Sequence, residues 1–151
     1  MGCLSIVLLL FAVVYLTVAF TPTQRQFQNE ALAKHNEYRS KNCVSQLTLD
    51  DQLSATAQAY AEYLANTGKF QHSGAKGLGE NLYMMRGSGQ ITVNGIQPTK
   101  SWYDEINLYN FERQGFTSGT GHFTQVVWAG TKKLGMGIAY GNDGRSAVVV
   151  G

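Results

Sequence analysis

The stretch SGTGHFTQVVWAGTKKLGMG, residues 118–137, places a single histidine between glycines and a short apolar run. Phe123, Val126 and Val127 follow His122 at helical spacing, so we expect a short helix after the histidine. Glycine permits backbone angles that other residues avoid, so the chain around His122 can turn sharply. Two interpretations stay open at this point: His122 is a displayed reactive group, or it is a polar residue in an ordinary turn.

The residues after Lys132 predict a β-hairpin. In KKLGMGIAY, residues 132–140, apolar side chains alternate with glycines, as in a strand with one covered face. That face would carry Leu134, Met136, Ile138 and Tyr140. Glycine inside a strand indicates that another backbone or a side chain presses close. GNDGR, residues 141–145, turns the chain, and SAVVVG, residues 146–151, returns as an apolar antiparallel strand.

Helices are expected to dominate the earlier part of the chain, because sixteen of the 17 glycines lie at or after Gly68. The capping-box pattern Thr23-x-x-Gln26 opens a first helix. Asp51 can cap a second helix, which Gly68 ends, and a third helix is expected to start at Thr99. The apolar residues of this third helix are Trp102, Ile106 and Tyr109.

Together these elements predict a single α+β domain over residues 21–151. LGENLYM, residues 78–84, supplies a further strand, and the mixture of helices and strands fits a layered arrangement. About 130 residues are enough for one well-packed core. Because the sequence stops at Gly151 within an apparent strand, we expect the last strand to be truncated.

Residues 1–20 differ from the rest of the chain. The segment MGCLSIVLLLFAVVYLTVAF contains no Asp, Glu, Lys or Arg and is almost wholly apolar. Thr17 and Ala19 form a small-x-small pattern that a signal peptidase accepts, so we expect a signal peptide cleaved near Ala19 and a secreted, extracellular protein. The alternative is that residues 4–20 are retained as a membrane anchor.

Charge and cysteine content narrow the possible functions. The net charge of +2, without a long run of Lys and Arg, argues against a nucleic-acid-binding protein. Cys43 is the single cysteine after residue 20, so it cannot form a disulfide within that part of the chain. We expect Cys43 to be a small semi-buried side chain, and intermolecular pairing is the alternative.

Histidines and glutamates are the main candidates for chemistry. His35 lies on the apolar side of the first helix, which indicates a structural role. His72, Glu80, Glu105 and His122 are spaced unlike any compact metal motif. Such a set can bind a divalent cation, act as a general acid and base around a water, or form a buried hydrogen-bonded network. Spacing alone leaves all three possibilities open.

Four segments resemble motifs of the CAP superfamily, named for cysteine-rich secretory proteins, antigen five and plant pathogenesis-related proteins. GHFTQVVWAGTKKLGMG, residues 121–137, is similar to the family signature, and AKHNEYRSKN, residues 33–42, to its first-helix pattern. HSGAKGLGENLY, residues 72–83, and SWYDEINLYNF, residues 101–111, are similar to two further motifs. These motifs occur in the family's order, and FTSGTGHFTQVVW is most similar to the Golgi-associated plant pathogenesis-related branch.

The resemblance implies a three-layer α-β-α sandwich with a central antiparallel sheet, and a cleft lined by two histidines and two acidic residues. Matched motif by motif, these four residues are His72, Glu80, Glu105 and His122, which we call the cleft tetrad. Some members bind zinc through the two histidines, so His72 and His122 are the implied ligands of zinc or another divalent cation. The superfamily has no shared reaction and is linked to sterol and lipid binding, defence and protein association.

The leading hypothesis is a secreted binding module that is not an enzyme, with a divalent cation in the cleft and a sterol or lipid in an apolar groove. Flexible methionines and other apolar residues of segment 77–97 suit such a groove. They are Leu82, Tyr83, Met84, Met85, Ile91 and Ile96.

Two alternatives remain. The protein is a hydrolase or peptidase in which a metal or histidine activates water and Glu80 or Glu105 acts as the base. Or it is a protein-association module, such as a homodimer, in which the tetrad is structural.

The aromatic pattern Tyr109-x-Phe111-x4-Phe116 has the spacing proposed for caveolin-type partners, but we expect these rings to pack in the core.

Overall fold

The computed structural model describes residues 19–113, 115–141 and 143–151. The predicted signal peptide, and the alternative anchor at residues 4–20, lie outside this part of the chain except for Ala19 and Phe20. In the ranges that are described, no helix has the length and apolar character needed to cross a membrane.

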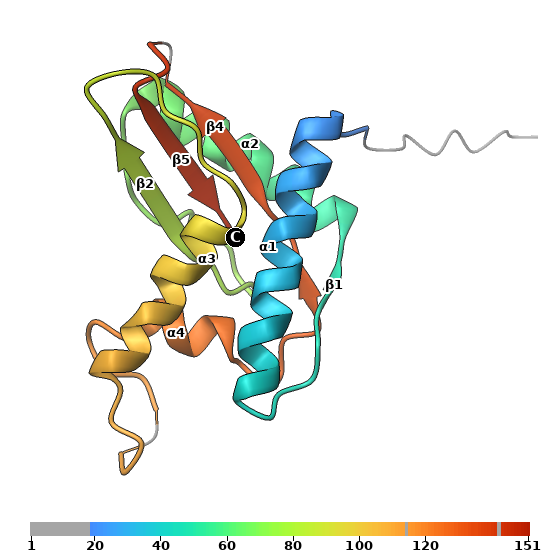
Figure 1. The fold of residues 1–151 in the computed structure, drawn as a ribbon, viewed down its shortest axis with the longest axis vertical. Coiled ribbons are helices and arrows are strands. Elements are labelled where there is room, and N and C mark those ends of the chain that lie inside the picture. Colours follow the sequence, from blue (N-terminus) through green and yellow to red (C-terminus); the bar gives the residue numbers. More distant parts are fainter. Residues whose placement is uncertain (1–18, 114, 142) are drawn as a thin grey trace, which may run out of the picture.

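The described chain contains helices and short strands (Figure 1). The helices are α1 (Pro22–Lys41), α2 (Asp51–Thr67), α3 (Ile96–Tyr103), the 3-10 helix η1 (Asp104–Leu108) and α4 (Gly121–Val126). The strands are β1 (Thr48–Leu49), β2 (Leu82–Arg86), β3 (Lys133–Leu134), β4 (Gly137–Tyr140) and β5 (Ser146–Val150).

An antiparallel sheet in the order β2-β5-β4 forms the middle layer, and the predicted hairpin is its β4–β5 pair. Side chains of the central strand alternate between two apolar clusters. Ala147 and Val149 pack with residues of α1 and α3, whereas Val148 and Val150 pack with residues of α2. Helix α2 therefore covers one face of the sheet, and α1 and α3 cover the other (Figure 1). The predicted α-β-α sandwich is confirmed.

Glycines let α2 approach the strands closely, as the sequence predicted. A Cβ atom on Gly137 would lie 2.3 Å from the backbone nitrogen of Gln58, and one on Gly135 would lie 2.3 Å from the backbone of Leu53. The single predicted strand over 132–140 is divided, because β3 pairs in parallel with β1 and only β4 joins the main sheet. Tyr140 was expected on the covered face but is 41% exposed.

The predicted start of the first helix was wrong by two residues. The capping box is formed by Thr21 and Gln24, whose side chains bond to each other's backbone N–H groups. Thr23-x-x-Gln26 has the same pattern, but starting at Thr21 places Pro22 at the first helical position. Proline suits that position because its ring presets the helical φ angle and its missing N–H would have no intrahelical partner.

The other helix ends also differ from the prediction. Asp50, not Asp51, caps α2 by accepting a bond from the Leu53 backbone, while Gly68 ends this helix as predicted. Helix α3 starts at Ile96 instead of Thr99, because a proline is tolerated within the first helical turn. The chain tightens into η1 after Tyr103, so Ile106 lies in a 3-10 helix and Tyr109 lies beyond it.

Cys43 is exposed, and the expected semi-buried position was wrong. It follows the α1 C-cap Asn42 and has a φ of 54°, a left-handed conformation. The Cys43 N–H donates to the Ser40 carbonyl, and the Val44 N–H donates to the Arg39 carbonyl. These two bonds form a Schellman motif, which ends α1 with Cys43 in the left-handed conformation.

Candidate functional site

The four tetrad residues line one cleft with a volume of about 470 Å³. His72 lies in the loop after α2, and Glu80 precedes β2. Glu105 belongs to η1, and His122 lies in the first turn of α4. The fold therefore brings together residues from four separate segments, arranged as two histidine–glutamate pairs.

The first pair joins His72 to Glu80. Nδ1 of His72 lies 2.7 Å from Oε1 of Glu80, and the same oxygen accepts a 2.9 Å hydrogen bond from the Ser73 backbone N–H. The imidazole is 63% exposed and the carboxylate is 17% exposed. Glu80 thus holds a histidine that reaches solvent.

The second pair joins His122 to Glu105. Nδ1 of His122 lies 2.6 Å from Oε1 of Glu105. Oε2 of Glu105 accepts from the backbone N–H groups of His122 at 2.8 Å and Phe123 at 3.1 Å. Thr120, the N-cap residue of α4, makes no side-chain capping bond. Glu105 therefore supplies this cap from a different element, and its negative charge lies at the positive end of the helix.

The donor atoms suit a divalent cation bound by two histidines. Because a glutamate bonds Nδ1 of each imidazole, the neutral ring carries its proton there and leaves Nε2 as a free lone pair. The bonded carboxylate oxygens orient the rings and would be outer-shell partners of a cation bound at Nε2. Within the described ranges, no three His, Cys, Asp or Glu side chains lie so that they could hold one metal ion together.

A nucleophile is not evident beside either histidine. In the part of the chain that is described, no Ser, Thr or Cys side chain hydrogen-bonds to His72 or His122. Ser73 Oγ instead accepts from the Ala75 backbone N–H. The arrangement lacks the hydroxyl–imidazole contact on which nucleophilic catalysis depends.

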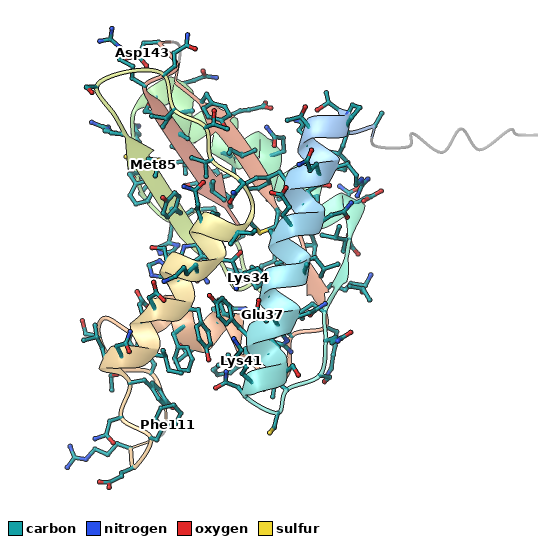
Figure 2. The ribbon with its side chains drawn as sticks, viewed as in Figure 1. Lys34, Glu37, Lys41, Met85, Phe111 and Asp143 are labelled. Carbon is teal, nitrogen blue, oxygen red and sulfur yellow. The ribbon has the colours of Figure 1, made fainter. Side chains whose placement is uncertain are left out.

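Sequence reasoning missed two aromatic residues that line the cleft. Phe116 is 77% exposed and Trp128 is 57% exposed, and both contribute to its wall. Phe111 is also exposed, on the loop at the lower tip of the molecule (Figure 2). The expectation that Phe111 and Phe116 pack in the core was wrong, because the described residues of this loop, 110–113 and 115–119, all lie exposed at the surface. For the cleft residues Phe116 and Trp128, the one signal in the sequence was their position on either side of the GTGH segment that carries His122.

His35 has the structural role that the sequence indicated. It is buried, its Nδ1 lies 2.8 Å from the Ala31 carbonyl, and its ring packs at a tilt against Trp102. Burial lowers the pKa of His35 to about 4, because the charged form would lose its hydration. His35 is therefore neutral in the folded protein near neutral pH.

An apolar cleft of about 530 Å³ lies beside the tetrad cleft, between α2 and the chain that leads into β2. Its wall includes Leu53, Ala57, Tyr60, Leu78 and Val150, and Glu80 borders both clefts. The six apolar residues expected to form a groove in segment 77–97 do not line it. Leu82 and Met84 pack toward α2 while Tyr83 and Met85 pack on the opposite face, because successive strand residues alternate.

Comparisons with known proteins agree with this fold. The model of the cysteine-rich secretory protein family, CAP, matches residues 32–151. The Golgi-associated plant pathogenesis-related protein 1 of Homo sapiens is 47% identical over 128 residues, covering 83% of this chain and 80% of that protein. Salivary antigen-5 of Dipetalogaster maximus is 42% identical over 145 residues, covering 79% of this chain and 56% of that protein. The chain thus spans little more than half of the second relative.

Two solved structures share the fold. The structure of BmVAL-1 has a TM-score of 0.69 and 26% sequence identity, and the match covers 87% of this chain and 76% of that chain. The structure of NaASP2 with Zn2+ has a TM-score of 0.62 and 25% identity, covering 83% of this chain and 77% of that chain.

Proposed function

This chain belongs to the cysteine-rich secretory protein (CAP) family, and from that premise we propose that it is a non-enzymatic binding protein whose cleft holds one divalent cation. Nε2 of His72 and Nε2 of His122 are the proposed ligand atoms, and zinc is the first candidate. The observation that carries this proposal is that each histidine has its Nδ1 bonded to a glutamate. The presence of Zn2+ in the structure of NaASP2 supports the choice of metal.

The glutamates act as orienting groups in this proposal. Glu80 and Glu105 each hold an imidazole by Nδ1 and also accept a backbone N–H beside that imidazole. Such outer-shell carboxylates fix the tautomer of a ligating histidine and raise its basicity. A bound divalent cation would supply Lewis-acid character and positive charge to whatever ligand enters the cleft.

The same bonds argue against the hydrolase alternative. A general base must be free to accept a proton from the attacking water. Both oxygens of Glu105, and one oxygen of Glu80, are already engaged with histidine and backbone donors. The engagement of both oxygens disfavours Glu105 as the base of a hydrolase.

Zinc titration of the purified protein tests this proposal. We expect one zinc per chain by calorimetry, with the affinity lowered at least tenfold by His72→Ala or His122→Ala. His35→Gln is the matched control, since His35 lies in the interior and should leave zinc binding unchanged. Absence of zinc binding at micromolar concentrations contradicts the proposal. Peptide or ester hydrolysis by the wild type that disappears in Glu105→Gln would instead support the hydrolase.

We further propose that the apolar cleft takes a sterol or the chain of another lipid. Its volume of about 530 Å³ and its mostly aliphatic wall support an apolar ligand of that size. Ala59 borders this cleft and is exposed, so Ala59→Trp should fill it without entering the core. We expect the wild type to bind about one fluorescent sterol per chain. Ala59→Trp should abolish this binding, because its indole ring would occupy the cleft. Gln52→Trp, on the exposed side of α2, is the control that should leave binding intact.

Export remains part of the proposed function. Residues 1–20 have the composition of a signal peptide, and one relative bears the name "Secreted protein RBT4". When the full chain is expressed in a secreting cell, the culture medium should contain a protein whose first residue lies near Phe20. Retention of the intact chain in membranes would support the anchor alternative.

Light scattering with and without zinc would detect the homodimer that the protein-association alternative requires.

A further inference from the structure

The two histidine–glutamate pairs belong to different parts of the fold. The first pair lies on the chain between α2 and β2, where residues 69–79 are exposed. The second pair joins η1 to α4. Two imidazoles can share one cation only if these two parts keep a fixed separation, since a metal–nitrogen distance tolerates an error of only about 0.2 Å.

Asn81 connects the two parts. It directly follows Glu80, and its Nδ2 donates a 3.0 Å hydrogen bond to the His122 backbone carbonyl. In the described residues, this is the single hydrogen bond between segment 69–81 and a histidine or glutamate of the second pair. Trp102 Nε1 donates nearby to the Leu82 carbonyl, but that bond reaches neither pair.

The backbone of Asn81 is also fixed by hydrogen bonds. Its backbone N–H donates to the Gly151 carbonyl at 2.8 Å, and its carbonyl accepts from the Gly151 N–H at 3.0 Å. The residue is 4% exposed and borders the tetrad cleft. Beside it, Gly79 packs against the Gln125 side chain, a contact without a hydrogen bond between them. Asn81 is thus fixed to the sheet through its backbone and to α4 through its side chain.

We propose that Asn81 is a positioning residue for the cation site, and this inference rests on the proposed function. Its amide holds His122 at a set distance from Glu80 and therefore from His72. A buried amide suits this role because it donates to a carbonyl without adding a charge that would itself attract the cation. Without the amide, each pair keeps its own internal bonds, but the separation between the two imidazoles is no longer fixed.

Asn81→Leu tests the inference, because leucine has a similar shape and no hydrogen-bond donor. Zinc affinity should fall by about 10–100-fold, the usual effect of losing an outer-shell partner. In 15N NMR spectra of the wild type, one equivalent of zinc should shift Nε2 of His72 and His122 together. In Asn81→Leu the two signals should respond at different zinc concentrations, a change that general destabilisation does not produce.

Asn42→Leu is the matched control. Asn42 also donates its side-chain amide to a backbone carbonyl, that of Tyr38 at 2.9 Å, as well as to the Tyr103 hydroxyl at 2.9 Å, but it does not line the tetrad cleft. This variant should bind zinc within twofold of the wild type. If Asn81→Leu does not fold, Asn81→Ser, whose shorter side chain cannot span the same gap, is measured in the same way.

The outcomes separate the inference from the function on which it rests. A wild type that binds no zinc overturns both. A wild type that binds zinc, together with an Asn81 variant of unchanged affinity and coincident histidine shifts, overturns the positioning role alone. Equal losses of affinity in the Asn81 and Asn42 variants also overturn it, because the loss would then come from stability.

Discussion

Glu105 illustrates at the scale of one residue how a candidate cleft residue also stabilises the fold. It accepts bonds from two consecutive backbone N–H groups of α4 and from the His122 ring. An acceptor at the start of a helix satisfies donors that have no partner within it. Removing this side chain therefore affects the helix as well as the cleft.

We predict that Glu105→Ala lowers the free energy of unfolding by about 2 kcal/mol, because two partly buried N–H donors at the start of α4 lose their acceptor. Urea denaturation followed by circular dichroism measures the change. Glu112→Ala is the control, since Glu112 is exposed on the following loop and its removal should cost less than about 0.5 kcal/mol. Equal losses in the two variants would show that Glu105 does not cap α4.

His35 should make the stability depend on pH. The folded protein keeps its imidazole neutral, with the pKa lowered to about 4 by burial, whereas the unfolded chain protonates it below about pH 6.5. Between these values the unfolded state binds more protons, so stability falls as the pH falls, by up to about 3 kcal/mol.

Denaturation curves from pH 7 to pH 4 measure this loss, with His35→Gln as the comparison. The variant keeps His72 and His122, so the difference between the two pH profiles isolates His35. The same slope in both proteins would contradict the prediction.

At the scale of elements, α2 packs directly against the backbone of the chain from β3 to β4. Gly137 leaves no room for a side chain, because a Cβ there would meet the backbone of Ala57 and Gln58. Backbone atoms of a packed helix cannot move aside as a flexible side chain can. This contact is needed to place α2 over the sheet.

We predict that Gly137→Ala lowers the free energy of unfolding by about 3 kcal/mol, at the upper end of the cost of overpacking. Gly89→Ala is the control, because a Cβ at Gly89 meets no atom within 4 Å. Thermal unfolding of both variants gives the comparison. A Gly137 variant as stable as the Gly89 variant would mean that α2 can move away without cost.

The helix ends illustrate which local features could be read from sequence. Two overlapping capping patterns, starting at Thr21 and at Thr23, compete for the start of α1, and Pro22 decides between them. Asp50 and Asp51 compete in the same way at α2. Cap patterns located these helices correctly, but adjacent residues of the same type left the boundary uncertain by one or two positions.

At the scale of the whole molecule, Arg39 ties α1 to the chain between α4 and β3. It is fully buried and donates to the carbonyls of Ser45, Val126, Trp128 and Thr131. A guanidinium group can serve four acceptors in one plane, whereas an ammonium group cannot. Arg39 thus holds the backbone of Trp128 beside the cleft.

We predict that Arg39→Lys lowers the free energy of unfolding by about 3 kcal/mol, because several buried carbonyls lose their donor. Arg25→Lys is the control, since Arg25 forms an exposed ion pair with Asp51 and should cost less than about 1 kcal/mol. Chemical denaturation of both variants tests this. Similar stabilities would mean that lysine or water satisfies the carbonyls equally well.

Sequence alone determined the layers of this protein and the four residues proposed for its cleft. Helical periodicity, caps and the apolar hairpin depend on neighbouring residues, so they can be read locally, and the CAP motifs indicated His72, Glu80, Glu105 and His122 before their positions were known.

Only the tertiary structure decided how these four residues pair, since hydrogen bonds between distant segments depend on where the chain returns. It also decided that Asn81 bonds to the backbone of His122 and that Phe111 and Phe116 face solvent. An apolar side chain is buried only when another element covers it, and that covering is a property of the whole fold.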